Sequence, residues 1–280
     1  MHTLAEKRRE FKKLHEAGCL VLPNPWDIGS ARYLQGLGFK ALATTSAGAA
    51  FALGYADNEV PLDVMLHHLR DIAKAVDVPV SADFGNCFAH DPKTVGTNVR
   101  AAIETGVAGV SIEDNSGDRN KPLYDLAHAV ERVKAAVSAV EHSGTGVVLT
   151  ARAENFLVGK PDLNDAIERI RAYADAGAHC LYIPGIKTRE QIAAVVKAVA
   201  PKPVNVLVGG PSEFTVQDLA ALGVRRISTG SGLARVAWGG FVRAAGQLAQ
   251  GGRFDGFKDS ASHPELNKFF HEDLARRPKP

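Results

Sequence analysis

Short apolar runs of strand length alternate with amphipathic helical stretches along almost all of the 280 residues. Each run is nearly continuous in hydrophobicity, which is typical of parallel strands that are buried on both faces. The eight runs span residues 19–22, 39–45, 78–84, 107–113, 146–152, 179–184, 203–209 and 225–229. Eight such strands separated by helices predict an α/β fold of the closed (β/α)8 TIM-barrel type.

The segments between these runs carry the signals that helix ends require. Thr188 followed by Gln191 reads as a capping box, and Gly177 and Gly223 stand where left-handed C-terminal caps are expected. The predicted helices between strands include residues 61–75, 92–105, 125–141, 163–176 and 189–199.

Further helices are predicted outside the barrel repeat. One, at residues 4–16, precedes the first strand, whereas 231–250 and 264–276 supply more helix after the last strand than one barrel unit needs. We therefore expect a single domain over residues 1–280, whose C-terminal helical extension from about residue 231 packs on a partner subunit.

Composition excludes several classes of protein. With 45% hydrophobic residues the chain can bury a large core, and its formal net charge of +2 comes from lysines and arginines spread along the sequence. This distribution gives no electrostatic case for binding nucleic acid or an anionic membrane surface. No apolar stretch approaches the ~20 residues of a membrane span, and the N-terminus lacks the apolar core of a secretion signal, so we expect a cytoplasmic location. The three cysteines, Cys19, Cys87 and Cys180, form no CxxC pair and predict neither a disulfide framework nor a structural zinc site.

Charged side chains stand at or just past the C-terminal ends of several apolar runs. They are Asp57, Asp83, Glu113, Asp114 and Arg152. Parallel barrels carry their chemistry at this end of the strands, so these residues are the first candidates for an active site. Taken alone, Asp57 is as well explained by a turn or a helix cap as by a metal role.

The acidic residues in this group suit a hard divalent cation. Mg²⁺ takes one or two carboxylates directly and keeps several waters, so Asp83 is the predicted direct ligand and Asp57 and Glu113 are predicted to bind through water. Such an ion can stabilise an enolate formed when a bond next to a carbonyl breaks. Arg152 can then bind a carboxylate or phosphonate as a bidentate donor.

Two further polar residues, Glu154 and Asn205, are predicted to point from the fifth and seventh strands toward the same face. They either hydrogen-bond to substrate and orient Arg152, or they satisfy polar groups inside the barrel mouth. Cys87 lies on the loop after Asp83, where it acts as a nucleophile only if it is activated as a thiolate. By default a cysteine packs as a small hydrophobe, and Cys87 stays outside the predicted site.

Several motifs, in order and spacing, resemble those of the isocitrate lyase and phosphoenolpyruvate mutase superfamily over residues 20–251. They are Asn-Pro-Trp-Asp at 24–27, Ser-Ala-Arg at 30–32, Thr-Thr-Ser-Ala-Gly at 44–48, Leu-Gly-Tyr-Ala-Asp at 53–57, Pro-Val-Ser-Ala-Asp at 79–83, Gly-Val-Ala-Gly-Val-Ser-Ile-Glu-Asp at 106–114 and Thr-Ala-Arg-Ala-Glu at 150–154. Within the superfamily the chain is most similar to the phosphonomutase-like branch, of the carboxyphosphonoenolpyruvate mutase type.

The resemblance implies a TIM barrel whose last helix is swapped between subunits of a homo-oligomer, a dimer or more usually a tetramer. It also implies Mg²⁺, with Mn²⁺ as a possible substitute, and a small carboxylate or phosphonate substrate. By position, Asp83 matches the direct metal ligand, Asp57 and Glu113 the water-mediated ones, and Arg152 the clamp for the substrate anion. Thr45, Ser46 and Ala47 match the turn whose backbone N–H groups bind the substrate carboxylate.

The sequence departs from the superfamily pattern at two places. Gly85 stands two positions after Asp83, where a second acidic residue is usual. The loop at residues 115–122 lacks the Lys-Lys-Cys-Gly-His motif of isocitrate-type lyases, so cleavage of isocitrate or methylisocitrate is not expected. Its polar residues are compatible in type with those of phosphonopyruvate enzymes but do not reproduce their order.

The leading hypothesis is therefore a Mg²⁺-dependent lyase or decarboxylase that cleaves a C–C bond of a small 2-oxo or 2-hydroxy carboxylate through an enolate. The alternative is P–C bond chemistry of the phosphonomutase or phosphonopyruvate hydrolase type. A second alternative, motivated by Gly85 and the unmatched loop, is a binding protein built on a decayed active site.

Overall fold

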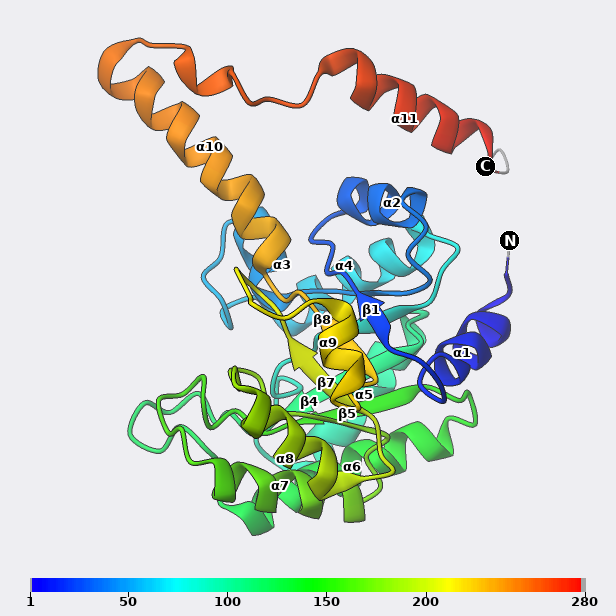
Figure 1. Cartoon of the computed structure of the whole chain (residues 1–280). Coiled ribbons are helices and arrows are strands. Elements are labelled where there is room, and N and C mark those ends of the chain that lie inside the picture. The colour runs from blue at the N-terminus through cyan, green and yellow to red at the C-terminus, as the bar shows by residue number, and fades with distance from the viewer. Residues whose placement is uncertain (1, 278–280) are drawn as a thin grey trace.

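Eight parallel strands surround a common axis in the computed structural model, which describes residues 2–277 (Figure 1). The strands are β1 (Leu20–Leu22), β2 (Leu42–Ala43), β3 (Val80–Ala82), β4 (Gly109–Glu113), β5 (Val148–Arg152), β6 (Cys180–Tyr182), β7 (Val204–Leu207) and β8 (Arg226–Ser228). They pair in the order β1-β8-β7-β6-β5-β4-β3-β2. The two end strands meet where the Ala43 N–H donates to the Pro23 carbonyl at 3.2 Å. The predicted (β/α)8 barrel is thus confirmed, and each strand lies inside its predicted run.

Helices connect and cover these strands. They are α1 (Leu4–Lys13), α2 (Ile28–Gly36), α3 (Ser46–Leu53), α4 (Leu62–Ala75), α5 (Pro92–Glu104), α6 (Leu126–His142), α7 (Leu163–Asp175), α8 (Arg189–Val199), α9 (Val216–Ala221), α10 (Gly232–Gly251), the 3₁₀ turn η1 (Asp255–Phe257) and α11 (His263–Ala275). The capping box of Thr188 and Gln191 is present, and Gly177 and Gly223 have positive φ angles of 106° and 89°. The extra N-terminal helix is confirmed, although it ends at Lys13 rather than at residue 16.

An apolar layer closes the end of the barrel where the strands begin. The buried ring of Phe11 from α1 packs there with Leu20, Ala41 and Val148. Gly109 makes room for that ring, because a Cβ at this position would lie 2.7 Å from it. With the N-terminal end sealed by apolar side chains, access to the interior is left to the C-terminal ends of the strands.

The C-terminal helices leave the barrel as an arm (Figure 1). Helix α10 projects away from β8, and α11 then returns to α2, where the rings of Phe269 and Tyr33 lie 4.7 Å apart. Gly36 gives this contact its close approach, since a Cβ there would meet Phe269 at 2.5 Å. None of the helices within residues 2–277 has the length and apolar character that a membrane crossing requires.

Candidate active site

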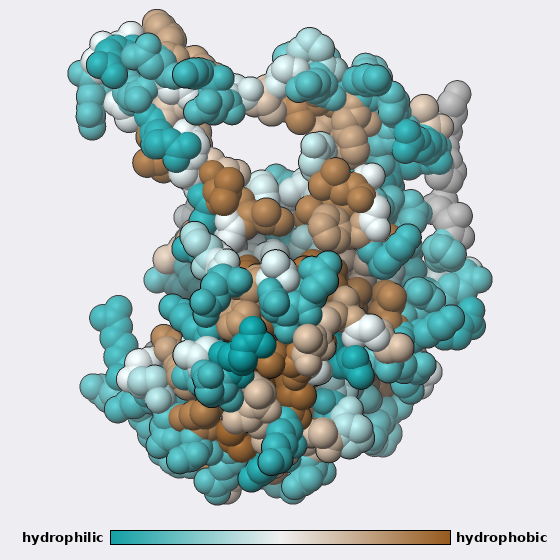
Figure 2. Space-filling model, viewed as in Figure 1, coloured by the Kyte–Doolittle hydropathy of each residue, from teal (hydrophilic) through white to brown (hydrophobic). Residues whose placement is uncertain are grey.

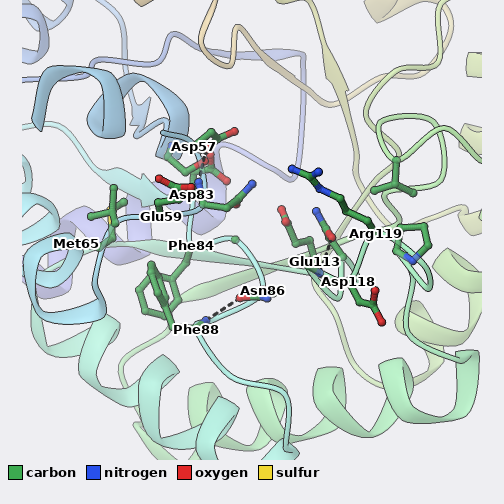
Figure 3. Close-up of a pocket in the computed structure, with 18 residues that line it drawn as sticks. Asp57, Glu59, Met65, Asp83, Phe84, Asn86, Phe88, Glu113, Asp118 and Arg119 are labelled. Atoms are coloured by element: carbon green, nitrogen blue, oxygen red, sulfur yellow. Dashed lines mark hydrogen bonds between the residues drawn. The ribbon is translucent and has the colours of Figure 1, made fainter. Parts of the chain in front are cut away.

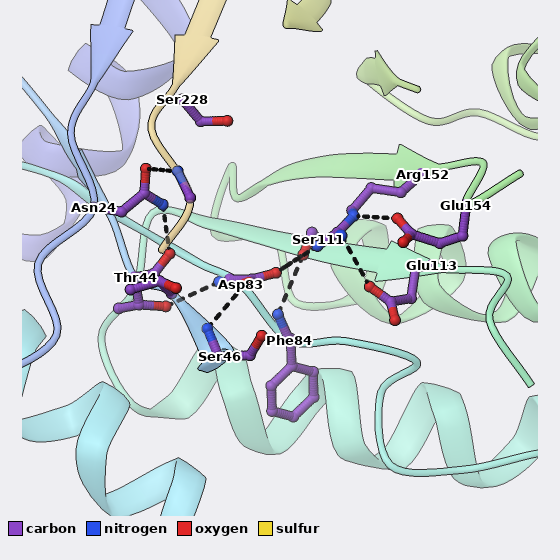
Figure 4. Close-up of polar contacts among 12 residues, drawn as sticks. Asn24, Thr44, Ser46, Asp83, Phe84, Ser111, Glu113, Arg152, Glu154 and Ser228 are labelled. Carbon is purple, nitrogen blue, oxygen red and sulfur yellow. Dashed lines mark hydrogen bonds and ion pairs between the residues drawn. The ribbon is translucent and has the colours of Figure 1, made fainter. Parts of the chain in front are cut away.

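Arg152, the last residue of β5, lies at the centre of a cluster of carboxylates (Figure 4). Its Nη1 lies 2.7 Å from Asp83 Oδ1, its Nη2 3.2 Å from Glu113 Oε2, and its Nε 2.9 Å from Glu154 Oε1. Only 12% of its side chain is exposed. The register explains part of this geometry, because Glu113 of β4 is paired directly with Arg152. The structure therefore brings together three of the residues that the sequence placed at strand ends, Asp83, Glu113 and Arg152, and adds Glu154 to them.

Backbone groups at the end of β2 hold Asp83 in place. The Ser46 N–H donates to Asp83 Oδ2 at 2.9 Å, and the Asp83 N–H donates to Thr44 Oγ1 at 2.9 Å. The predicted carboxylate-binding turn at Thr45–Ala47 is thus the first turn of α3, which Thr45 caps by accepting from the Gly48 N–H at 3.2 Å. One of its three N–H groups is engaged by Asp83. The role of this turn in binding substrate stays a prediction.

Asp57 follows α3 on an exposed loop at the mouth of the barrel. It lines an outer cavity of about 630 Å³ together with Asp83, Glu113 and Ser46 (Figure 3). Desolvation by the surrounding walls raises the pKa of Asp57, and the nearby Asp83 carboxylate raises it further. Asp57 is not a helix cap, since α4 begins at Leu62 with Pro61 at its N-cap. Its Oδ1 accepts from the Asn58 N–H at 3.0 Å, as in a turn, and its metal role stays a prediction.

Charge crowding is strongest around Glu113. Burial raises the pKa of Glu113 well above its ordinary value, against the lowering effect of Arg152, and the Glu154 and Asp83 carboxylates raise it further. Burial works to lower the pKa of Arg152, but these same three carboxylates outweigh it, so the guanidinium stays charged. The site is a cavity with more negative than positive groups, which favours a cation.

The donor set fits Mg²⁺ by its chemistry. Within residues 2–277, no three His, Cys, Asp or Glu side chains converge as ready-made ligands of one ion. A hard cation that keeps several waters does not need such a cluster, and carboxylates from Asp83, Asp57 and Glu113 around one cavity are the oxygen ligands that it prefers. The division into one direct and two water-mediated ligands stays a prediction.

Glu154 and Asn205 occupy different positions. Glu154 is buried beside Arg152, where it supports the guanidinium from the side of Nε. Asn205 of β7 is buried inside the barrel, and its Nδ2 donates to Ser228 Oγ at 3.0 Å. The predicted contacts of both with substrate remain untested predictions, although only Glu154 touches Arg152.

Asp114 belongs to the support of the site. Its side chain accepts from the Glu154 N–H at 2.8 Å, from the Tyr173 hydroxyl at 2.6 Å and from Arg169 Nη1 at 3.1 Å. These buried contacts tie the end of β4 to α7 and to Glu154, the second residue after β5. Asp114 thus positions Glu154 from outside the two cavities at the barrel mouth.

The loop after β3 is shaped by its backbone. Gly85 has a φ of 52°, in the left-handed region that side chains other than glycine rarely adopt, and its carbonyl accepts from the Glu113 N–H at 3.1 Å. Cys87 is fully buried, and desolvation raises the pKa of its thiol to about 12. A thiol with so high a pKa is a poor source of thiolate, so Cys87 is a packing residue.

A second, inner cavity of about 150 Å³ lies beneath Arg152 and shares Ser46, Asp57 and Asp83 with the outer one. Its lining includes Arg226 of β8, which the sequence reasoning did not identify. The available signal was strand alternation: a charged residue two positions before Ser228 in an apolar strand faces the barrel interior.

Comparison with known proteins links this geometry to an enzyme family. The family model described as phosphoenolpyruvate phosphomutase matches residues 11–249. A crystal structure of a lyase/mutase from Burkholderia cenocepacia is 45% identical, with a TM-score of 0.91 over 95% of this chain and 96% of that one. Oxaloacetate acetylhydrolase in complex with its product oxalate is 28% identical, with a TM-score of 0.85 over 97% and 96% of the two chains. An oxaloacetate decarboxylase of Paraburkholderia xenovorans is 30% identical over 234 residues, 81% of this chain and 75% of its own.

Proposed function

The chain belongs to the phosphoenolpyruvate phosphomutase family, whose members are lyases and mutases, and we propose that it is a Mg²⁺-dependent carbon–carbon lyase or decarboxylase acting on a small 2-oxo or 2-hydroxy carboxylate. The observation that carries the proposal is the buried guanidinium of Arg152 among three carboxylates at the open end of the barrel.

The geometry of Arg152 divides its donors into two sets. Nε faces Glu154, whereas Nη1 and Nη2 face Asp83 and Glu113, the carboxylates proposed to serve the cation. When Asp83 and Glu113 bind a cation, Glu154 still orients the guanidinium of Arg152. Nη1 and Nη2 of Arg152 can then bind a substrate carboxylate in bidentate fashion. Bound Mg²⁺ would supply the Lewis acidity that stabilises an enolate oxygen. Mn²⁺, which prefers the same oxygen ligands, is a possible substitute.

The relatives support the substrate class. One is an oxaloacetate decarboxylase, and another is an oxaloacetate acetylhydrolase solved with oxalate. A small inner cavity of about 150 Å³, below the 300–1,000 Å³ that drug-sized ligands occupy, also favours a substrate of few atoms.

P–C bond chemistry is the second candidate, and the description of the family model as a phosphomutase favours it. Both candidates use the same cation and enolate, so they differ in whether the anion next to the breaking bond is a carboxylate or a phosphonate. A panel of 2-oxo dicarboxylates and phosphonopyruvate distinguishes them by product. A binding protein on a decayed site remains the alternative if no member of the panel turns over.

We further propose that the arm formed by η1 and helices α10 and α11 packs on a partner subunit of a homo-oligomer. Its side chains include Val236, Phe241 and Phe254, which are 74%, 61% and 66% exposed. In Figure 2 hydrophobic residues follow α10 along the edge of the opening between the arm and the barrel. Large apolar groups on one projecting element are typical of an interface surface.

Thermal stabilisation by Mg²⁺ and oxalate, added separately and together, tests the enzymatic proposal. Oxalate resembles the enolate of pyruvate, and a ligand that binds only the native state raises its stability. We expect the joint shift in Tm to exceed the sum of the separate shifts, and we expect Asp83→Ala to abolish this synergy. Glu131→Ala, which removes an exposed carboxylate from a surface ion pair on α6, is the matched control and should retain it. No shift of the wild type at ~10 mM of both ligands would contradict the Mg²⁺-enolate site.

A further inference from the structure

Arg226 lies inside the barrel, below Arg152 and toward the sealed end. It is paired in register with Leu20 of β1 and Asn205 of β7, and only 5% of it is exposed. Its guanidinium lies 6.0 Å from the centre of the Phe11 ring at the barrel floor. It also lines the inner cavity, where Arg152 is the other cationic residue.

Arg226 differs from Arg152 in its partners, and from the buried Arg8 and Arg132, which donate to backbone carbonyls, in lining a cavity. Nη1 donates to Thr150 Oγ1 at 2.9 Å and Nη2 to Ser81 Oγ at 3.4 Å, both neutral hydroxyls. Its Nε has no hydrogen-bond partner, and no carboxylate in residues 2–277 forms an ion pair with it. By contrast, Arg152 contacts three carboxylates, and Arg169 contacts Asp114 and Asp165.

A charge in this position is costly for folding alone. Removing a guanidinium from water costs several kcal/mol unless an opposite charge or strong hydrogen bonds compensate. Hydroxyl groups compensate weakly compared with a carboxylate, which accepts two parallel hydrogen bonds from an arginine. Arg8 and Arg132 offset this cost by donating to backbone carbonyls, whereas Arg226 donates to two hydroxyls and faces a cavity, so its guanidinium points to an anionic ligand there.

The two cations of the inner cavity are also distinct in kind. Arg152 carries its own carboxylates, one of which, Asp83, is fixed by Ser46. Of the two, Arg226 is the one that forms no ion pair with a carboxylate in the described residues. A substrate with two anionic groups can therefore place one beside Arg152 and the other beside Arg226, nearer the N-terminal end of the barrel.

We propose that Arg226 is a substrate-binding residue that selects dicarboxylates, by binding the second carboxylate of a short substrate whose first carboxylate lies at Arg152 and the α3 turn. This inference rests on the proposed function. The ligand class is a four-carbon dicarboxylate with a 2-oxo or 2-hydroxy group, because a cavity of about 150 Å³ admits little more. A monocarboxylate of the same length would leave Arg226 without a charged partner.

Isothermal titration of the full-length protein with Mg²⁺ tests this selection. The probes are malate and 2-hydroxybutyrate, which share four carbons and the 2-hydroxy acid but differ in a carboxylate or a methyl group at the far end. We expect the wild type to bind malate at least about tenfold more tightly, as a charge-assisted pair of hydrogen bonds implies. Arg226→Met should abolish this preference while the Kd of oxalate, which has no distal group, changes less than about threefold.

Two further variants separate binding from a role in folding. Thr150→Val removes the hydroxyl that accepts from Arg226 but keeps the charge, so it should retain the malate preference. Arg226→Lys keeps the positive charge but loses the paired N–H donors of the guanidinium, so it should retain part of the preference for malate. If Arg226→Met does not fold, the wild-type ratio and the lysine variant still decide the question.

The possible failures are distinguishable. If the wild type binds oxalate in a separate titration but binds malate and 2-hydroxybutyrate equally, the role of Arg226 is overturned and the proposed function is not. An Arg226→Met variant that loses oxalate and malate affinity in equal proportion also overturns this role, because the residue then acts structurally. Failure of the wild type to bind oxalate in Mg²⁺ contradicts the proposed function, on which the inference depends.

Discussion

The barrel interior and the C-terminal arm break opposite rules of protein architecture. Inside the barrel the charged side chains of Glu113 and Arg226 are buried and that of Arg152 nearly so, whereas on the arm large side chains such as Phe241 and Phe254 are exposed. Burying a charge and exposing a large apolar group both cost free energy. Neither arrangement serves the stability of an isolated chain, so each region points to an interaction beyond its own fold.

The two regions differ in how far the chain itself compensates the cost. Arg152 and its carboxylates neutralise much of each other's charge within the barrel. In the described part of the chain, no comparable neutralising contact covers the exposed apolar side chains of α10, because α10 projects from the barrel and it is α11 that packs on α2 (Figure 1). The interior is thus organised before a ligand binds, whereas the arm depends on a second surface.

Replacing Arg152 should give the largest effect. Arg152→Met removes the charge that holds three carboxylates together and the proposed substrate clamp, so we expect kcat/KM for whichever 2-oxo dicarboxylate of the panel turns over to fall at least about 10²–10³-fold. For Arg152→Lys we expect kcat/KM to fall nearly as far, because an ammonium group cannot replace the guanidinium N–H donors that contact Asp83, Glu113 and Glu154. Steady-state kinetics measure both variants, and near-wild-type turnover of either would remove Arg152 from the centre of the chemistry.

A buried histidine at the barrel floor predicts a pH dependence of stability. Nδ1 of His15 lies 2.7 Å from the Phe11 carbonyl, and desolvation, with Arg226 nearby, lowers the pKa of His15 to about 4. In the unfolded chain the imidazole takes up a proton near its ordinary pKa of 6.5, so the native state loses stability as the pH falls from about 6.5 to about 4. At ~1.4 kcal/mol per pKa unit the loss approaches about 3 kcal/mol.

Urea unfolding of the wild type and His15→Gln between pH 7 and 4.5 isolates this contribution. The difference in unfolding free energy between the two proteins should shrink or reverse toward low pH. His142→Gln, at an exposed position near the end of α6, is the control and should track the wild type. A constant difference across the range would mean that His15 is not the group that titrates.

The arm predicts a smaller change, in assembly rather than folding. Phe241→Asp should weaken self-association at least about tenfold, because burying one large apolar side chain contributes roughly 1.5–3 kcal/mol. Val216→Asp, which replaces an exposed valine at the start of α9 on the barrel, should leave association unchanged. Sedimentation equilibrium measures the self-association of both variants. A wild type that is monomeric at ~100 μM would contradict the proposal that the arm packs on a partner subunit.

The fold was predictable because parallel strands buried on both faces leave continuous apolar runs in a sequence. Residues at the ends of such strands share one edge of the barrel, which is why Asp83, Glu113 and Arg152 were predicted together and lie together. The helices of the arm were predictable as well, but the exposure of their apolar side chains required the structure.

Which side of the barrel wall a side chain points to was harder to predict from the sequence. Arg225 and Arg226 are neighbours in sequence, yet Arg225 is exposed and Arg226 is buried inside the barrel, since successive residues of a strand point to opposite faces. Asp114 likewise follows Glu113 but turns toward Tyr173 and Arg169. A one-residue difference in register decides each case, and composition does not reveal register.

Gly85 provides the smallest effect and the finest test of how the interior is built. By comparison with the superfamily it is a missing acid, but its φ of 52° and its acceptance of the Glu113 N–H make it part of the backbone frame around the carboxylates. A Cβ at this position meets no atom within 4 Å, so the cost of Gly85→Ala comes from conformation alone and should be about 1–2 kcal/mol. Gly85→Asn should cost less, because asparagine tolerates the left-handed region. If urea unfolding gives equal midpoints for the wild type, alanine and asparagine variants, the loop does not require glycine, and loss of an acidic ligand becomes the better explanation of this position.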